Sequence, residues 1–263
     1  MRKTNAALCL VLLAVCGSPG LADEWNKSFS VSGKADLRVE VDDGEAIVHA
    51  WDRSQIEARI TTQGWRIGPA EVRVTDHQAG DRVEIEVRVP RTHITFLSSR
   101  SVHVELQVPR ALRATIHSGD GRISIQDVKG EIHLSTSDGS VEADSVDGDF
   151  EAKTGDGRIR ASGRWDRLIL ETSDGSIEAE ARAGSKMAGA WRIHRGDGSV
   201  TLRLPENFAA DLDAHTGDGR ITVDLPVTAS GTIGGPDLRG KLNGGGQTLV
   251  VRTGDGPIHL HRL

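Results

Sequence analysis

An Asp-Gly dipeptide recurs along the second half of the chain, and its spacing restricts the possible folds more than any other feature. Four copies follow one another at intervals of 18 residues: Asp120-Gly121, Asp138-Gly139, Asp156-Gly157 and Asp174-Gly175. Three further copies come at longer intervals: Asp197-Gly198, Asp218-Gly219 and Asp255-Gly256. Self-similarity at a fixed period is the signature of a repeat architecture, in which each unit takes an equivalent place in space.

The residues around each dipeptide alternate between apolar and polar side chains. The third residue after the Asp is always β-branched, the fourth is polar and the fifth is apolar; the third residues are Ile123, Val141, Ile159, Ile177, Val200, Ile221 and Ile258. The residues before the Asp alternate in the same way, and two positions before it stand Ser118, Thr136, Thr154, Thr172, Arg195, Thr216 and Thr253. A period of two is typical of half-buried strands, so each unit should form two short strands and two turns. We expect the hydroxyls of this column to bond one another and the turn backbone.

These repeats predict an all-β fold. A coil that returns to the same point after each turn would place equivalent residues in stacked parallel strands, whereas a meander would reverse every second strand. We therefore predict a β-solenoid, that is, a parallel β-helix with roughly 18-residue rungs. An antiparallel β-sandwich is the alternative, because Asp-Gly is also a common hairpin turn.

The chain divides into three regions. Residues 1–22 should be a signal peptide, residues 23–116 should form irregular N-terminal β rungs, and residues 117–263 should form the regular Asp-Gly repeat solenoid. Because strand patterns run through both of the latter regions, we expect them to form one continuous domain.

The first 22 residues have the three parts of a secretory signal. Two basic residues precede the apolar run 6–15, and a small-x-small cleavage site ends at Ala22. Both cysteines, Cys9 and Cys16, lie inside this segment, so the mature chain would contain no thiol. Cys16 would be the lipid anchor of a lipoprotein, but Val15 stands where such signals have a small residue, which favours cleavage after Ala22.

Charge and composition narrow the classes of partner. The formal net charge is −6 and the sequence pI is about 5.9, which argues against a nucleic-acid partner. No segment after residue 22 is apolar over the length of about 20 residues that a transmembrane helix needs. We expect an exported protein, located in the periplasm or at the cell surface.

Several repeats resemble a known family. The segments Thr-Gly-Asp-Gly-Arg-Ile at 154–159 and 216–221, and Thr-Ser-Asp-Gly-Ser-Ile at 172–177, are similar to those of the putative-adhesin β-strand-repeat proteins of bacterial envelopes. The ending Leu-Asn-Gly-Gly-Gly at 242–246, followed by 250–256, is similar too. The resemblance covers most of the chain after residue 22. It implies an exported β-helical domain of unassigned biochemical function, and it supplies no catalytic residues.

The repeated carboxylates are the first candidates for a metal site. Asp120, Asp138, Asp156 and Asp174 would stack along one edge, and a line of Ca²⁺ ions would relieve their mutual repulsion. The repeats lack the Gly-Gly-x-Gly-x-Asp order of calcium-binding solenoids. We therefore favour the alternative that each Asp caps its own turn while the Gly takes a positive φ, and we predict no bound metal.

Two other motifs have simpler explanations. His117, His194 and His215 share one column, and His194 and His215 would meet if their rungs were adjacent, but two histidines make an incomplete metal site. The tripeptide 195–197 spells Arg-Gly-Asp, a known cell-attachment sequence, yet it is also the ordinary turn with Arg at the Thr position.

We expect a protein without catalytic residues or cofactor, which acts as an adhesin-like interaction module of the cell envelope or surface. The expected partner is a cell-envelope protein or polymer, contacted through outward residues such as Arg158 and Arg160. A polysaccharide-active β-helix enzyme is one alternative, since some parallel β-helices cleave acidic glycans, and a purely structural envelope protein is another. Acids spread evenly by the repeat, with aromatics at only 3%, favour the binding module over the enzyme.

Overall fold

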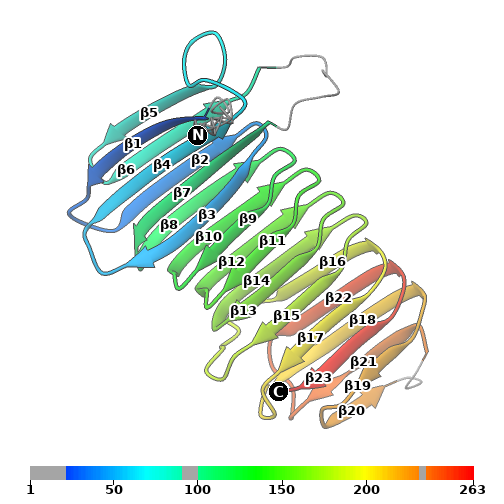
Figure 1. Ribbon diagram of the computed structural model, residues 1–263. Coiled ribbons are helices and arrows are strands. Elements are labelled where there is room, and N and C mark those ends of the chain that lie inside the picture. Colours follow the sequence, from blue (N-terminus) through cyan, green and yellow to red (C-terminus); the bar gives the residue numbers. More distant parts are fainter. Residues whose placement is uncertain (1–21, 91–99, 231–234) are drawn as a thin grey trace, which may run out of the picture.

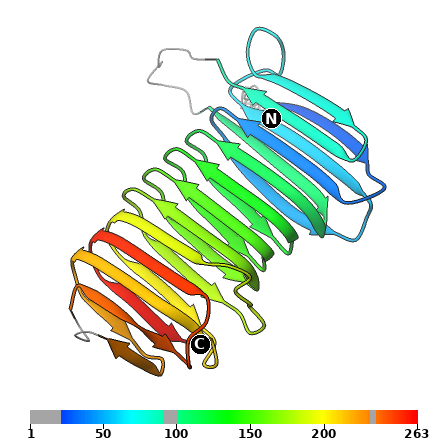
Figure 2. The same cartoon turned by 180° about the vertical axis from the view of Figure 1, so that it is seen from behind.

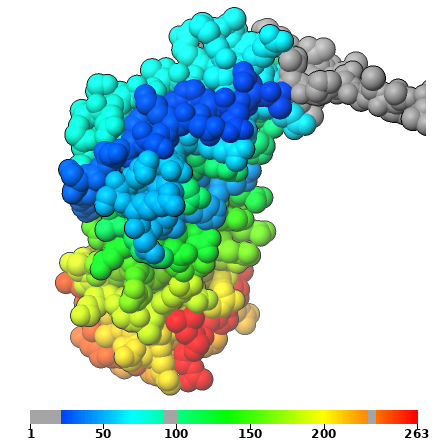
Figure 3. Space-filling model, turned by 60° about the vertical axis from the view of Figure 1, so that its left-hand side comes forward, coloured from blue at the N-terminus to red at the C-terminus, as the bar shows by residue number. Residues whose placement is uncertain are grey.

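The computed structural model describes residues 22–90, 100–230 and 235–263. In these residues the chain forms strands and connecting turns, arranged as two long sheets packed face to face (Figure 1). The molecule is elongated, with blue and cyan strands at one end of the stack and yellow, red and orange strands at the other, so that the two ends of the described chain lie toward opposite ends of the body (Figures 1 and 3).

We name the two sheets A and B. Sheet A has the order β1 (Ala22–Ser30), β4 (Gln55–Gln63), β7 (Ser101–Pro109), β3 (Glu45–Trp51), β9 (Ile123–Gln126), β11 (Val141–Asp144), β13 (Ile159–Gly163), β15 (Ile177–Ala181), β17 (Val200–Leu204), β23 (Ile258–Arg262) and β19 (Ile221–Val223). Sheet B has the order β20 (Val227–Ser230), β21 (Asp237–Leu242), β18 (Ala210–Asp218), β22 (Thr248–Asp255), β16 (Trp191–Asp197), β14 (Trp165–Thr172), β12 (Asp147–Thr154), β10 (Lys129–Thr136), β8 (Ala111–Ser118), β2 (Ala35–Val41), β6 (Arg82–Arg88) and β5 (Arg73–Ala79).

The repeat region is a parallel solenoid, as the 18-residue period predicts. Each rung gives one strand to each sheet, and equivalent residues pair directly: Ile159 lies between Val141 and Ile177 in sheet A. In sheet B, Thr154 pairs with Thr136 and Thr172 in the same way. The strand pairing within the repeat confirms the β-solenoid and excludes the antiparallel sandwich.

The order of the rungs along the stack differs from their order in the chain at both ends. The rung formed by β22 and β23 inserts between the rungs of β16–β17 and β18–β19 (Figure 2). His194 and His215 therefore do not meet, because Arg252 pairs between them. At the other end, the rung β2–β3 lies between β6–β7 and β8–β9.

Antiparallel strands close the ends of the stack. Strands β4 and β1 extend sheet A beyond β7, and β5 extends sheet B beyond β6. At the far end, β21 and β20 extend sheet B beyond β18. These strands share the core of the rungs: Phe29, Ile56, Ile60 and Leu238 are all buried.

The apolar columns of the repeat fill the space between the sheets. Ile159 and Ala161 are buried, as are their counterparts in the neighbouring rungs. From β12 onward, larger rings fill part of the core. Phe150, Trp165, Trp191 and Phe208 form a continuous row, with ring centroids 6.2, 6.0 and 5.1 Å apart. Contacts of this kind add to the free energy gained from burying the rings.

The Asp-Gly turns stack along one long edge, which we call the Asp-Gly edge. Its turns contain, in spatial order, Asp43, Asp120, Asp138, Asp156, Asp174, Asp197, Asp255 and Asp218. The first of these was not recognised as a member of the repeat in the sequence. A Cβ built on Gly157 would overlap the carbonyl oxygen of Gly139 in the preceding rung, and Gly139 has the same relation to Gly121.

This stacking corrects the expected role of the glycines. Of the glycines in the seven predicted Asp-Gly turns, only Gly198 and Gly256 have a positive φ, of 124° and 115°. At the other turns glycine is required because the backbones of consecutive rungs touch, which leaves no room for a side chain.

The Thr column, and not the Asp column, caps these turns. Thr136 Oγ1 donates to the carbonyl oxygens of Gly119 and Gly121 in the preceding rung, at 2.8 and 3.2 Å, and accepts the N–H of Gly139. Thr154 bonds in the same pattern one rung later. The hydroxyls thus bond the turn backbone as predicted, but through the carbonyls of the neighbouring rung and not through one another.

The predicted signal peptide and the residues Cys9 and Cys16 lie outside the described residues, apart from Ala22 at the start of β1. Within the described part of the chain, no helix is long and apolar enough to cross a membrane.

Candidate functional site

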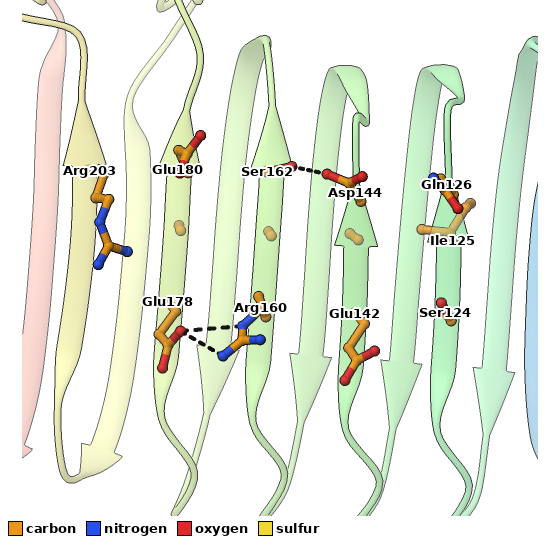
Figure 4. Close-up of a pocket in the computed structure, with 13 residues that line it drawn as sticks. Ser124, Ile125, Gln126, Glu142, Asp144, Arg160, Ser162, Glu178, Glu180 and Arg203 are labelled. Atoms are coloured by element: carbon orange, nitrogen blue, oxygen red, sulfur yellow. Dashed lines mark hydrogen bonds and ion pairs between the residues drawn. The ribbon is translucent and has the colours of Figure 1, made fainter. Parts of the chain in front are cut away.

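A shallow groove runs across the rungs on the outer face of sheet A. It has a volume of 450 Å³ and extends from β9 to β17 (Figure 4). Its floor is formed by the strand backbone at small inward residues, among them Ala143, Ala161 and Ala179. Two outward columns form its walls: Ser124, Glu142, Arg160 and Glu178 on one side, and Gln126, Asp144, Ser162, Glu180 and Arg203 on the other.

Part of the groove's charge is held in contacts between rungs. Arg160 donates from Nη2 and Nε to Glu178 Oε2, at 3.1 and 3.3 Å (Figure 4). Ser162 donates to Asp144, and Arg182 reaches back over both of them, with its Nη2 3.0 Å from Asp144 Oδ1. These contacts cross two or three rungs, so they fix the walls of the groove as well as its charge.

Other charged groups in the groove have no such partner. Among the described residues, no ion pair or hydrogen bond of the Glu142, Glu180 or Arg203 side chains is found, although Glu180 and Arg203 are register neighbours. With four carboxylates and two guanidinium groups, the lining is acidic. Since exposed and unpaired polar groups are already solvated, they can bind a ligand without first breaking a contact within the protein.

The groove carboxylates face solvent. The Asp144 and Glu178 side chains are 58% and 36% exposed. The arrangement is suited to polar contacts with an extended ligand, at one row of side chains per rung.

The structure separates the two arginines predicted to interact. Arg160 lies in the wall of the groove, but Arg158 lies beside the Asp-Gly edge, where its Nε donates to Ser176 Oγ at 3.1 Å. Sequence reasoning placed Glu142 and Glu178 in the outward columns but missed Asp144, Glu180 and Arg203 as site residues. The signal of the missed residues was present, because they all lie six positions after the Asp, but the pattern shows only that this column points outward.

The four carboxylates named as metal candidates do lie in line along the Asp-Gly edge. Asp120, Asp138, Asp156 and Asp174 are exposed, and no hydrogen bond of their carboxylates is found among the described residues. Burial, followed by the charge of Asp120, raises the pKa of Asp43 at the start of the line. In residues 22–90, 100–230 and 235–263 no group of three or more potential ligands has the geometry to hold a metal ion.

Among the seven Asp-Gly repeats, Arg195 alone has no hydroxyl at the position of the Thr column, and it is buried. Its Nε and Nη1 have no hydrogen-bond partner among the described residues, and its guanidinium lies against Gly198, where a Cβ would overlap it. Burial lowers the pKa of Arg195, and the charges of Asp197 and Asp174 oppose this shift. The Arg-Gly-Asp tripeptide is therefore a turn whose arginine side chain is turned inward.

Comparison with known proteins identifies one matching family model and several solved structures. The model described as Toastrack DUF4097 matches residues 53–261. No curated protein matches the sequence.

Three of the similar solved structures are proteins of Clostridium sporogenes, Bacteroides fragilis and Parabacteroides distasonis. A putative cell adhesion protein from Clostridium sporogenes is 13% identical, with a TM-score of 0.46, and the match covers 92% of this chain and 100% of that one. A putative adhesin from Bacteroides fragilis is 10% identical, with a TM-score of 0.34 and coverage of 91% and 97%. A putative lipid binding protein from Parabacteroides distasonis is 11% identical, with a TM-score of 0.39 and coverage of 91% and 98%.

Proposed function

The chain belongs to the Toastrack DUF4097 family, and from this premise we propose that it is a non-catalytic, adhesin-like interaction module of the cell envelope. It binds an extended envelope protein or polymer along the groove on the outer face of sheet A. Membership of the family fixes the solenoid but assigns no activity, so the proposal rests on the groove.

The observation that supports it most directly is the set of unpaired charged side chains in the groove. Glu142, Glu180 and Arg203 stand on strands β11, β15 and β17, so unsatisfied groups recur along the stack over several rungs. Neighbouring strands lie about 4.8 Å apart. A ligand that lies along the stack therefore meets a new row of polar groups at each rung, which suits a long partner better than a small molecule.

The exposure of the groove carboxylates supports binding over catalysis. Asp144 accepts hydrogen bonds from Ser162 and Arg182, and Glu178 accepts hydrogen bonds from Arg160, so the protein fixes both carboxylates in place as acceptors on the walls of the groove. The secretory signal inferred at residues 1–22 supports export of the protein, and with it an envelope partner.

The test compares two double variants that remove the same charge from opposite faces. Glu142→Gln/Glu180→Gln neutralises the groove, and Asp36→Asn/Asp149→Asn neutralises two outward carboxylates of sheet B that also have no ion pair among the described residues. Binding is measured by co-sedimentation with purified peptidoglycan, envelope polysaccharide and envelope protein fractions. We expect one fraction to bind, with an affinity that falls as salt rises and drops about ten-fold in the groove variant only.

Equal loss in both variants would show attraction to overall charge and would contradict the groove. Turnover of a glycan in the same assays, abolished by a single carboxylate substitution, would establish an enzyme in place of a binding module.

A further inference from the structure

The long edge opposite the Asp-Gly edge has a second cavity, which the function proposed above does not use. It has a volume of 650 Å³ and is lined by four cations, two carboxylates, one serine and three small or apolar residues. We call it the edge cavity. We propose that the edge cavity binds an acidic sugar, that is, a ligand with one phosphate or carboxylate group on a hydroxyl-bearing body.

The cations come from successive turns of this edge. Arg110 precedes β8, Lys129 begins β10, Arg164 precedes β14 and Arg182 follows β15. Because rungs stack in register, these four residues form a row along the edge, and they all line one cavity. Arg110, Arg164 and Arg182 form ion pairs with Asp52, Asp147 and Asp144, so Lys129 is the cation of this row whose charge no ion pair among the described residues offsets. An exposed, unpaired ammonium group attracts anions.

Three of the four cations are engaged within the protein. Arg110 Nε donates to Asp52 Oδ1 at 2.8 Å, Arg164 binds Asp147 through two nitrogens, and Arg182 Nη1 donates to Ser145 Oγ at 2.7 Å. Lys129 has no ion pair or hydrogen bond of its ammonium group among the described residues, although its charge helps to lower the pKa of Asp147. Lys129 is therefore the cation that is free to bind an incoming oxyanion.

Acceptor groups lie in the same cavity. The Asp127 carboxylate is exposed and has no hydrogen bond among the described residues, and Ser145 Oγ can accept as well as donate. Sugar hydroxyls need such acceptors. Val128, Ala111 and Ala183 are small or apolar and leave space for a ring. The volume is within the range of ordinary small-ligand sites.

The backbone of the cavity is unusual. Three non-glycine residues have a positive φ in the described structure: Asp127 at 59°, Ser145 at 56° and Asn243 at 46°. Two of the three line this cavity, at equivalent positions in consecutive rungs. Left-handed backbone in residues other than glycine is concentrated at ligand-binding positions, because it costs free energy that the surrounding structure must supply. This observation is independent of the charges and points to the same place.

The test measures binding of four compounds to the full protein by calorimetry: glucose 6-phosphate, glucuronate, inorganic phosphate and glucose. We expect saturable binding of glucose 6-phosphate or glucuronate, with the tighter of the two identifying the phosphate or the carboxylate. Inorganic phosphate should bind at least ten-fold more weakly than glucose 6-phosphate, and glucose should not bind measurably.

Two variants test the roles of the lining residues. Lys129→Gln should weaken binding of the acidic sugar about ten-fold, and Asp127→Ala should weaken it while leaving inorganic phosphate unchanged. Lys34→Gln is the matched control, since Lys34 is also exposed and has no ion pair among the described residues. Unchanged thermal melting shows that each variant is folded. Absence of saturable binding by either acidic sugar, equal binding of glucose, or equal losses in Lys129→Gln and Lys34→Gln would each overturn the proposal.

Discussion

The two long edges of the solenoid are built from turns of different kinds. On the Asp-Gly edge an Asp-Gly turn recurs in every rung from Asp43 to Asp218, and in most of them glycine lies against backbone and a hydroxyl bonds across rungs. On the opposite edge the turn residues change from rung to rung. This edge has left-handed Asp127 and Ser145, and the excursion 182–190, which is yellow-green in Figure 1, interrupts the repeat there.

This difference distinguishes the part of the surface where the repeat serves stacking from the parts where a ligand can bind. At the Asp-Gly edge, the glycine is repeated because the backbones of consecutive rungs touch there, and the regular spacing serves stacking. At the opposite edge and in the groove of sheet A, the backbone tolerates different side chains. Unpaired groups such as Lys129 and Glu142 are found there. The most conspicuous motif of the sequence is thus a structural one.

The largest effect should come from glycine substitutions that compare the two edges. Gly157→Ala places a methyl group on the carbonyl oxygen of Gly139, so two rungs must move apart. We expect a loss of about 3 kcal/mol or more in the free energy of unfolding. Gly189→Ala, in the excursion on the opposite edge, meets no atom within 4 Å and should change stability by less than about 0.5 kcal/mol. Thermal melting followed by circular dichroism measures both.

Comparable melting shifts in the two variants would mean that the Asp-Gly edge is not the more constrained one. A small shift for Gly157→Ala alone would show that the rungs can separate at little cost, and would contradict the close stacking of their turns.

The second-largest expected effect on the free energy of unfolding distinguishes the Thr column from the Asp column of the Asp-Gly edge. Thr154→Val keeps the shape of the side chain but removes the hydroxyl that donates to Gly139 and accepts from Gly157. Because both backbone groups are left in a buried turn, we expect a loss of about 1–2 kcal/mol. Asp156→Asn should cost nothing measurable, since the carboxylate has no hydrogen bond among the described residues and loses only repulsion from its neighbours. A larger loss in Asp156→Asn than in Thr154→Val, measured by denaturant unfolding, would restore the Asp to the capping role.

The sequence was sufficient to predict the 18-residue rung and to assign its side chains to the inward and outward faces. A period of 18 residues with strict alternation determines which side chains point inward, and Ile159 and Arg160 lie as predicted. The reason is that alternation and period are local properties, which each unit repeats independently.

The order of the rungs could not be obtained in the same way. The rungs of Asp197, Asp218 and Asp255 have equivalent patterns, and nothing local to them specifies that the last inserts between the other two.

The prediction that each Asp caps its own turn was wrong for a related reason. An isolated Asp-Gly turn is stabilised by its own side chain and a positive φ, but in a stack the neighbouring rung supplies the hydrogen-bond partners and the steric limit. The edge cavity likewise depends on residues of several turns, and no single repeat contains it.

The smallest effect concerns an ion pair of the opposite edge and its dependence on pH. Burial alone would raise the pKa of Asp147, but the hydrogen bonds and charge of Arg164 outweigh it and hold that pKa below its ordinary value. A depressed pKa in the folded state means that the ionised carboxylate stabilises the fold at any pH above its unfolded pKa of about 3.9, and that this stabilisation is lost as the pH falls through the lower, folded value. The Arg164 side chain is 59% exposed, so solvent weakens the pair, and Asp147→Asn should cost under about 1 kcal/mol at neutral pH.

The difference in melting temperature between the natural protein and Asp147→Asn should be constant from pH 7 to about pH 5 and should shrink below about pH 4. On the Asp-Gly edge, Asp156→Asn has no partner to lose and should show no deficit at neutral pH. A deficit in Asp147→Asn that grows on acidification would contradict the ion pair, and an equal deficit in both variants would remove this distinction between the two edges.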